Sequence, residues 1–176
     1  MNPILADAGL PMVAVEYPVM LLGFVPIVIV EIAVARWRLG ITSRHAMKAA
    51  VLANVASTVL GFPLLWVLLV LLQLGLGGGR SYGLQMWWEK LYAVTVQAPW
   101  LIPYENDLGW MIPLAGIYLL VPAFFVSVWV ERVIYRRFWP EIEKERVNRF
   151  CWVTHYFSYA VLLILGALCY VIRFKK

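Results

Sequence analysis

The chain has 176 residues, of which 63% are hydrophobic and only 14% are charged. A soluble domain carries roughly a quarter of charged residues, so this composition excludes an ordinary soluble protein and predicts one whose solvent is largely lipid. The formal net charge of +5 could suggest a nucleic-acid partner. Most Lys and Arg residues lie in two segments beside apolar stretches, however, where membrane topology and anionic headgroups account for them. We therefore expect no nucleic-acid partner.

Four stretches contain almost no charged residues, and each is at least as long as the roughly 20 residues that an α-helix needs to cross the hydrocarbon. They cover residues 13–35, 49–74, 110–130 and 151–172. The sequence therefore predicts an all-α integral membrane protein, a four-transmembrane-helix bundle, with one transmembrane domain over residues 1–176.

The basic residues predict the orientation of these spans. Segment 36–48 holds four Lys or Arg residues and no acid, and segment 131–150 holds six. Because short loops rich in Lys and Arg stay in the cytoplasm, we expect both segments there. The longer loop, residues 75–109, and both termini are then predicted on the outer side of a cell membrane.

The outer loop contains a predicted amphipathic helix. Between residues 86 and 98, the side chains of Trp87, Leu91 and Val94 recur on one helical face, which is typical of a helix lying in the membrane interface. Its function is either to anchor the loop or to dock a partner. Aromatic residues expected at the interface are Trp87, Trp88, Trp100 and Trp110.

A degenerate internal repeat relates the two halves of the chain. In each half an acid ends one apolar stretch, and a polar pair follows early in the next, 23 residues later in the first half and 24 in the second. The matched residues are Glu31 with Asn54 and Ser57, and Glu131 with His155 and Ser158. The repeat predicts two helical hairpins of like orientation, related by an axis along the membrane normal.

A carboxylate inside the hydrocarbon costs a few kcal/mol, so Glu31 and Glu131 are candidate functional residues. The repeat places both near the cytoplasmic end, at the depth of the polar pairs. The predicted intramembrane polar cluster is Glu31, Asn54, Ser57, Glu131, His155 and Ser158, with Ser127 and Thr154 as neighbours.

Two uses of this cluster remain open. It can be a structural brace of Glu–Asn and Glu–His or Glu–Ser hydrogen bonds that holds each hairpin or fixes the pairing of the hairpins. Alternatively, it can bind a proton or a cation, because two carboxylates in one low-dielectric site repel each other. One histidine and no tight ligand spacing argue against a metal centre, and we expect no metal and no cofactor.

Small residues form a stripe along the second span at four-residue steps. The stripe consists of Ala49, Ala53, Ser57 and Gly61. Such a stripe lets helix backbones approach closely, so this span is predicted to be the central packing helix.

No motif of a nucleophile with a base is present, so we expect no enzyme. The first functional hypothesis is an interaction or accessory subunit of a membrane assembly, whose partners are lipid, other membrane subunits or further copies of the chain. The alternative is a small channel or transporter for an ion, a proton or a solute. It would use Glu31 and Glu131, in a homo-oligomer if four helices do not enclose a pore.

Overall fold

The structure is a computed structural model, which describes residues 12–76, 84–96 and 108–174. The described residues form five α-helices and no strand, which confirms the predicted all-α class. The helices are α2 (Met12–Leu39), α3 (Ser43–Gly75), α4 (Trp87–Thr95), α5 (Leu108–Phe138) and α6 (Lys144–Phe174).

Three of the described helices are long and apolar enough to cross a membrane. They are Ser43–Gly75 in α3, Pro113–Phe138 in α5 and Lys144–Leu168 in α6. These segments correspond to the second, third and fourth predicted spans and are compatible with a membrane protein. The first predicted span, residues 13–35, is not among them, and part of it lies outside the residues whose side chains are described.

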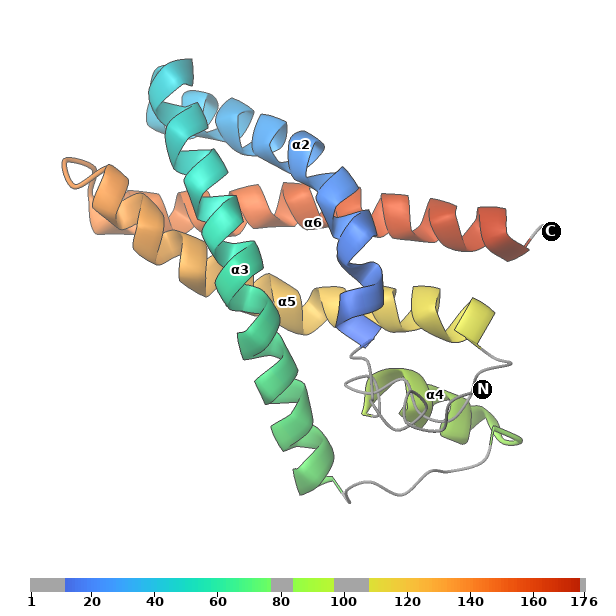
Figure 1. The fold of residues 1–176 in the computed structure, drawn as a ribbon. Helices are drawn as coiled ribbons and strands as arrows, with labels where there is room; N and C mark the ends of the chain where they lie inside the picture. The colour runs from blue at the N-terminus through green and yellow to red at the C-terminus, as the bar shows by residue number, and fades with distance from the viewer. Residues whose placement is uncertain (1–11, 77–83, 97–107, 175–176) are drawn as a thin grey trace.

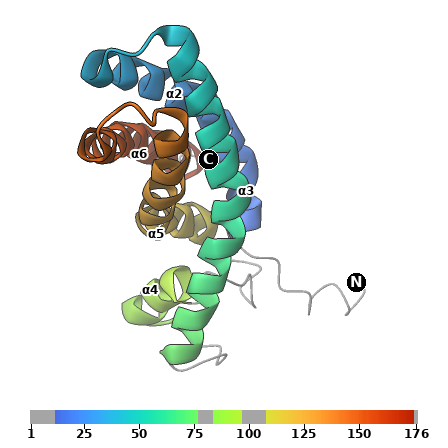
Figure 2. The same cartoon turned by 90° about the vertical axis from the view of Figure 1, so that its left-hand side faces the viewer.

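Two tight turns join the long helices in pairs. Between α2 and α3, Gly40 has a φ of +71°, a left-handed conformation that glycine adopts without steric cost. Its N–H donates to the carbonyl of Arg36 at 3.2 Å. Between α5 and α6, the N–H of Ile142 donates to the carbonyl of Trp139 at 3.1 Å. Both turns lie at the same end of the molecule (Figures 1 and 2), which we call the turn end.

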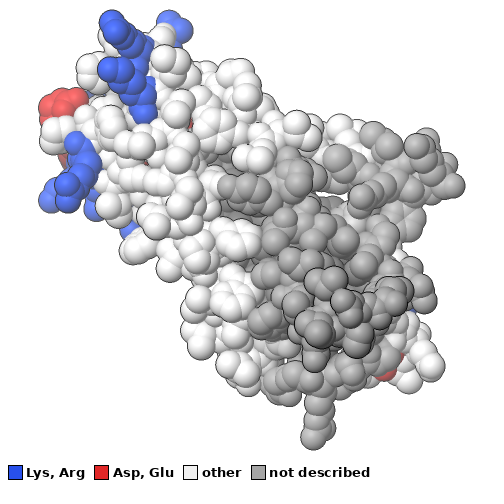
Figure 3. Space-filling model, viewed as in Figure 1, with Lys and Arg blue, Asp and Glu red and all other residues white. Residues whose placement is uncertain are grey.

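The helices extend beyond the predicted spans. Segment 36–48 was expected to be a loop, yet α2 continues to Leu39 and α3 begins at Ser43. Likewise α5 continues to Phe138 and α6 begins at Lys144. Lys and Arg side chains gather at the turn end (Figure 3).

The four long helices pack around two hydrophobic clusters. Helix α5 contacts α2, α3 and α6, and α2 also contacts α3 and α6. The first cluster lies at the turn end and includes Ala49, Tyr135 and Trp139. The second lies at the opposite end, which we call the α4 end, and includes Leu65 and Met111.

Large apolar side chains cover the outside of the long helices. Examples are Leu22 on α2, Leu71 on α3, Val121 on α5 and Leu168 on α6, all more than half exposed. Soluble monomers rarely expose contiguous apolar surface of this kind. The surface is therefore suited to lipid.

Helix α4 lies within the predicted helical segment 86–98. The Glu89 carboxylate accepts hydrogen bonds from the backbone N–H groups of Gln85 and Met86, both at 2.8 Å, and so caps the helix start. The predicted apolar face is divided, because Val94 is buried in the second cluster whereas Trp87 is 76% exposed. Helix α4 therefore packs one side on the bundle and turns Trp87 outward.

Candidate functional site

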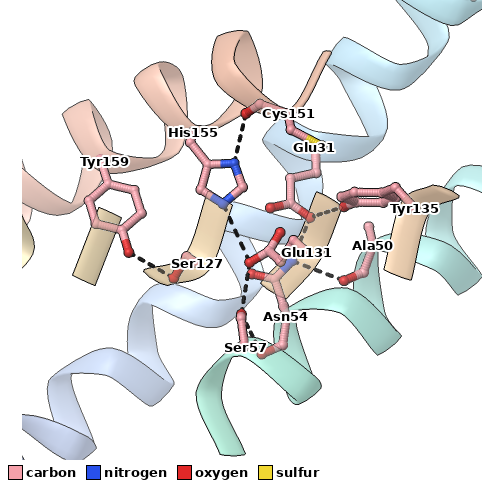
Figure 4. Close-up of polar contacts among 10 residues, drawn as sticks. All are labelled: Glu31, Ala50, Asn54, Ser57, Ser127, Glu131, Tyr135, Cys151, His155 and Tyr159. Atoms are coloured by element: carbon pink, nitrogen blue, oxygen red, sulfur yellow. Dashed lines mark hydrogen bonds and ion pairs between the residues drawn. The ribbon is translucent and has the colours of Figure 1, made fainter. Parts of the chain in front are cut away.

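All four long helices contribute to one buried group of polar side chains (Figure 4), which we call the polar layer. Glu31 lies eight residues before the end of α2, and Glu131 lies seven residues before the end of α5. These separations put both acids about 10–12 Å from the turn end along their helices. The polar layer consists of Glu31, Asn54, Ser57, Glu131, Tyr135 and His155.

Glu31 is held by donors from two other helices. Its side chain is buried, and its Oε2 accepts hydrogen bonds from Asn54 Nδ2 on α3 and from the Tyr135 hydroxyl on α5, the latter at 2.7 Å. The Asn54 amide also donates to the Ala50 carbonyl at 2.9 Å, which fixes its orientation. Helices α2, α3 and α5 are therefore joined at a single carboxylate oxygen.

Glu131 has fewer partners than Glu31. Its Oε1 accepts a hydrogen bond from the Ser57 hydroxyl at 2.8 Å and lies 3.6 Å from His155 Nε2. Its Oε2 is buried and has no hydrogen-bond partner among the described residues. One oxygen of this carboxyl group thus keeps its hydrogen-bonding capacity.

The carboxyl groups of Glu31 and Glu131 are neighbours in the polar layer (Figure 4). Two unit charges 4 Å apart repel by about 4 kcal/mol at an effective dielectric constant of about 20. A proton shared between two carboxyl groups removes this repulsion, as in other carboxyl dyads. The geometry is therefore that of a pair able to hold one proton.

The tautomer of His155 follows from its position. Its Nδ1 lies 2.7 Å from the Cys151 carbonyl, which can only accept, so Nδ1 carries a hydrogen. The ring nitrogen nearest Glu131 is then Nε2, which in the neutral ring has a free lone pair. Nε2 of His155 thus faces the Glu131 carboxyl group with its lone pair unused.

Buried hydroxyl groups adjoin the layer on α6. Thr154 Oγ1 and Ser158 Oγ have no hydrogen-bond partner among the described residues. Farther from the turn end, the Tyr159 hydroxyl donates to Ser127 Oγ at 3.0 Å (Figure 4). Polar side chains therefore continue along α6 for about one turn beyond His155.

Aromatic rings pack on both sides of the layer. Tyr135 stacks on Trp139 with ring centroids 4.7 Å apart, and both rings contact the edge of Phe150. Phe124 lies against His155 and Tyr159, with centroids at 6.0 and 5.2 Å. These rings lower the local dielectric constant, which strengthens every electrostatic interaction in the layer.

The structure brings five of the six residues of the sequence-predicted cluster into direct contact. Ser158 is also buried, and its hydroxyl has no hydrogen-bond partner among the described residues. The small-residue stripe faces the bundle: Ala49 and Ala53 are fully buried, and a Cβ on Gly61 would lie 3.7 Å from Val126 on α5.

The four tryptophans expected at the interface differ in their surroundings. Trp87 and Trp88 are exposed on α4, and the Trp88 indole N–H donates to Met86 Sδ at 3.2 Å. Trp110 packs against the second hydrophobic cluster. Trp100 lies outside the described residues.

Sequence reasoning missed Tyr135 and Tyr159. Tyr135 was assigned to a loop, although it lies four residues after Glu131 and therefore on the same face of a continuing helix. The same spacing relates Tyr159 to His155. A search for polar residues at four-residue steps from each candidate would have found both.

Within the described residues, no three His, Cys, Asp or Glu side chains gather in a way that could hold a metal ion. Comparisons with protein families, with characterised proteins and with solved structures found no match.

Proposed function

We propose that this protein is an integral membrane protein that takes up and releases a proton at the Glu31–Glu131 pair, as the central step of proton transfer. The observation that carries the proposal is that two buried carboxyl groups, one from each hairpin, are neighbours in the polar layer. A brace needs a donor for each buried acceptor, but among the described residues Glu131 Oε2 has none. A proton held between the two acids would supply it.

The proposal includes α2 as a fourth membrane span. Helix α2 packs against three other long helices, and Leu22, Val25 and Ile29 project from it with more than half of each side chain exposed. Its acid, Glu31, is buried among protein groups and not exposed to lipid. The basic turn end would face the cytoplasm of a cell, with both termini outside, and the two hairpins would represent an internal repeat.

Proton exchange would involve His155 and Glu131. The 3.6 Å separation of Nε2 and Oε1 is slightly too long for a hydrogen bond, and a small rotation of either side chain closes it. A proton leaving the carboxyl pair then binds Nε2. Because Nδ1 already carries a hydrogen, which it donates to the Cys151 carbonyl, His155 becomes an imidazolium. Ser158 and the Tyr159–Ser127 pair extend this route away from the turn end.

The test is proton flux in liposomes that contain purified protein and a trapped pH-sensitive dye. An imposed potassium potential should drive proton entry in the wild type, and Glu31→Gln and Glu131→Gln should each abolish it. Glu141→Gln is the matched control, since Glu141 is an exposed acid near the turn end and its loss should leave the flux unchanged. Equal flux in wild type and both amide variants would refute the proposal.

One observation favours a second candidate function. At the α4 end the buried core of the described residues is apolar apart from Gln73 on α3, so the polar side chains do not continue across the molecule. In that case the polar layer is a brace, and the protein is an accessory subunit that packs against other membrane proteins or further copies of itself.

Purification in a mild detergent distinguishes the two candidates. An accessory subunit should elute with a fixed partner, show no flux, and lose assembly when Glu31 or Glu131 becomes Gln. A proton-transferring protein should retain its flux when purified without other chains. Elution alone together with an absence of flux would count against both.

A further inference from the structure

We propose that helices α5 and α6 form a binding site for an anionic phospholipid at the turn end, with Arg132 and Arg136 holding the phosphate. The inference depends on the placement of these helices in a membrane but not on proton uptake. It starts from two guanidinium groups whose hydrogen-bonding capacity is only partly used.

Arg132 and Arg136 lie four residues apart on α5 and therefore project from the same face. Each has a buried Nε with no hydrogen-bond partner among the described residues. The Arg136 guanidinium also reaches Asn148 on α6. The face that carries the two charges therefore lies beside the junction of the two helices.

A polar side chain of α6 completes the proposed phosphate site. An Arg136 terminal nitrogen donates to Asn148 Oδ1 at 2.8 Å, which positions the guanidinium across the helix interface. Among the described residues, the one ion pair within 4.0 Å joins His155 to Glu131, so neither arginine forms an ion pair there. Two arginines without a bound carboxylate, at the depth of the headgroups, favour a phosphate.

An apolar surface continues from the arginines toward the membrane interior. Phe125 and Trp129 lie eleven and seven residues before Arg136, which puts them on the same face of α5. On α6, Trp152 lies four residues after Asn148. The rings of Phe125 and Trp152 contact each other with centroids 6.3 Å apart, so the two apolar faces adjoin.

A basic site that is followed by exposed aromatic side chains matches one kind of ligand. Phe125, Trp129 and Trp152 are all exposed, and an acyl chain can lie along them while its phosphate reaches the arginines. A soluble phosphate would use the arginines but not the aromatic side chains. A zwitterionic lipid would place its own cation near them, so an anionic headgroup is the better fit.

The first experiment measures lipid binding by native mass spectrometry and by the thermal-unfolding midpoint in an uncharged detergent. Phosphatidylglycerol should bind about twentyfold more tightly than phosphatidylcholine, and Arg132→Gln or Arg136→Gln should each weaken its binding about fivefold. Arg137→Gln is the matched control, because Arg137 is an exposed neighbour on α5; its affinity should stay within about twofold of wild type.

Three outcomes would overturn the proposal. They are equal binding of the two lipids, an equal loss in Arg137→Gln, and full protection by inorganic phosphate alone, which would identify the ligand as a soluble anion. A second measurement applies even where a glutamine variant does not fold. Brominated phosphatidylglycerol should quench tryptophan fluorescence at a lower concentration than brominated phosphatidylcholine, and Trp129→Phe with Trp152→Phe should abolish that difference.

Discussion

At the turn end, α2, α3, α5 and α6 meet through side-chain hydrogen bonds as well as an apolar cluster, whereas at the α4 end α3, α4 and α5 meet through apolar side chains. Burying a leucine against another helix gains little over burying it in lipid, so helix association in membranes relies on close packing and hydrogen bonds. The comparison therefore indicates that the turn end determines which helices pair. The apolar cluster at the α4 end also holds α4, which packs one side on the bundle.

The largest effect is expected from the aromatic cluster at the turn end. Trp139→Ala removes a buried ring that stacks on Tyr135 and contacts Phe150, and should lower the free energy of unfolding by about 3–5 kcal/mol. Titration with a denaturing detergent in mixed micelles measures it. Trp37→Ala is the control, since Trp37 is exposed, and an equal loss there would show that the cluster is not the stabilising feature.

A substitution in the second hydrophobic cluster, at the α4 end, should lower stability less and should also change protease cleavage. Met111→Ala empties a fully buried position beside Ala93 and Val94 of α4, and should cost about 2 kcal/mol. Loss of that contact should also increase cleavage by added protease between α3 and α5. Met47→Ala, at an exposed methionine, should change neither value, and unchanged cleavage in Met111→Ala would mean that α4 does not depend on this cluster.

A single hydroxyl group tests the polar layer. Tyr135→Phe keeps the ring on Trp139 but removes the donor to Glu31, so unfolding should become easier by about 1 kcal/mol. The same titration measures it, beside Tyr118→Phe at a more exposed tyrosine. A result indistinguishable from that control would show that the 2.7 Å contact contributes no stability.

The smallest effect distinguishes two buried serines on different helices. Ser57→Ala removes the donor to Glu131 and should cost about 0.6 kcal/mol, the average for such bonds in a membrane. Ser158→Ala should cost less, because its hydroxyl has no partner among the described residues. If Ser158→Ala proves the more costly, the network extends farther along α6 than the structure shows.

The sequence predicted the apolar helices well because long charge-free stretches have one stable form in lipid, where every backbone group must be paired within the segment. It also placed Glu31 and Asn54 at one depth, since the turn between their helices is short. It did not predict the contacts of Ser57 with Glu131 or of Tyr135 with Glu31. Those contacts depend on how one hairpin docks on the other, and side-chain spacing along a single helix does not contain that information.

The helix ends were harder to predict than the spans. Charged residues at 36–48 and 131–150 indicated loops, but helices continue through most of both segments. Lys and Arg are good helix formers, so their presence does not mark the end of a helix. Gly40 indicates the end of α2 better than the charged residues do, because the helix ends where this glycine adopts a left-handed conformation.

The tight turn at Gly40 also affects the order in which the polar contacts can form. Because so few residues separate α2 from α3, Glu31 can meet Asn54 as soon as these two helices form. Glu131 belongs to the other hairpin, and its Ser57 partner is reached only when the two hairpins join. Assembly of the hairpins is therefore the folding step that gives Glu131 its hydrogen-bond donor.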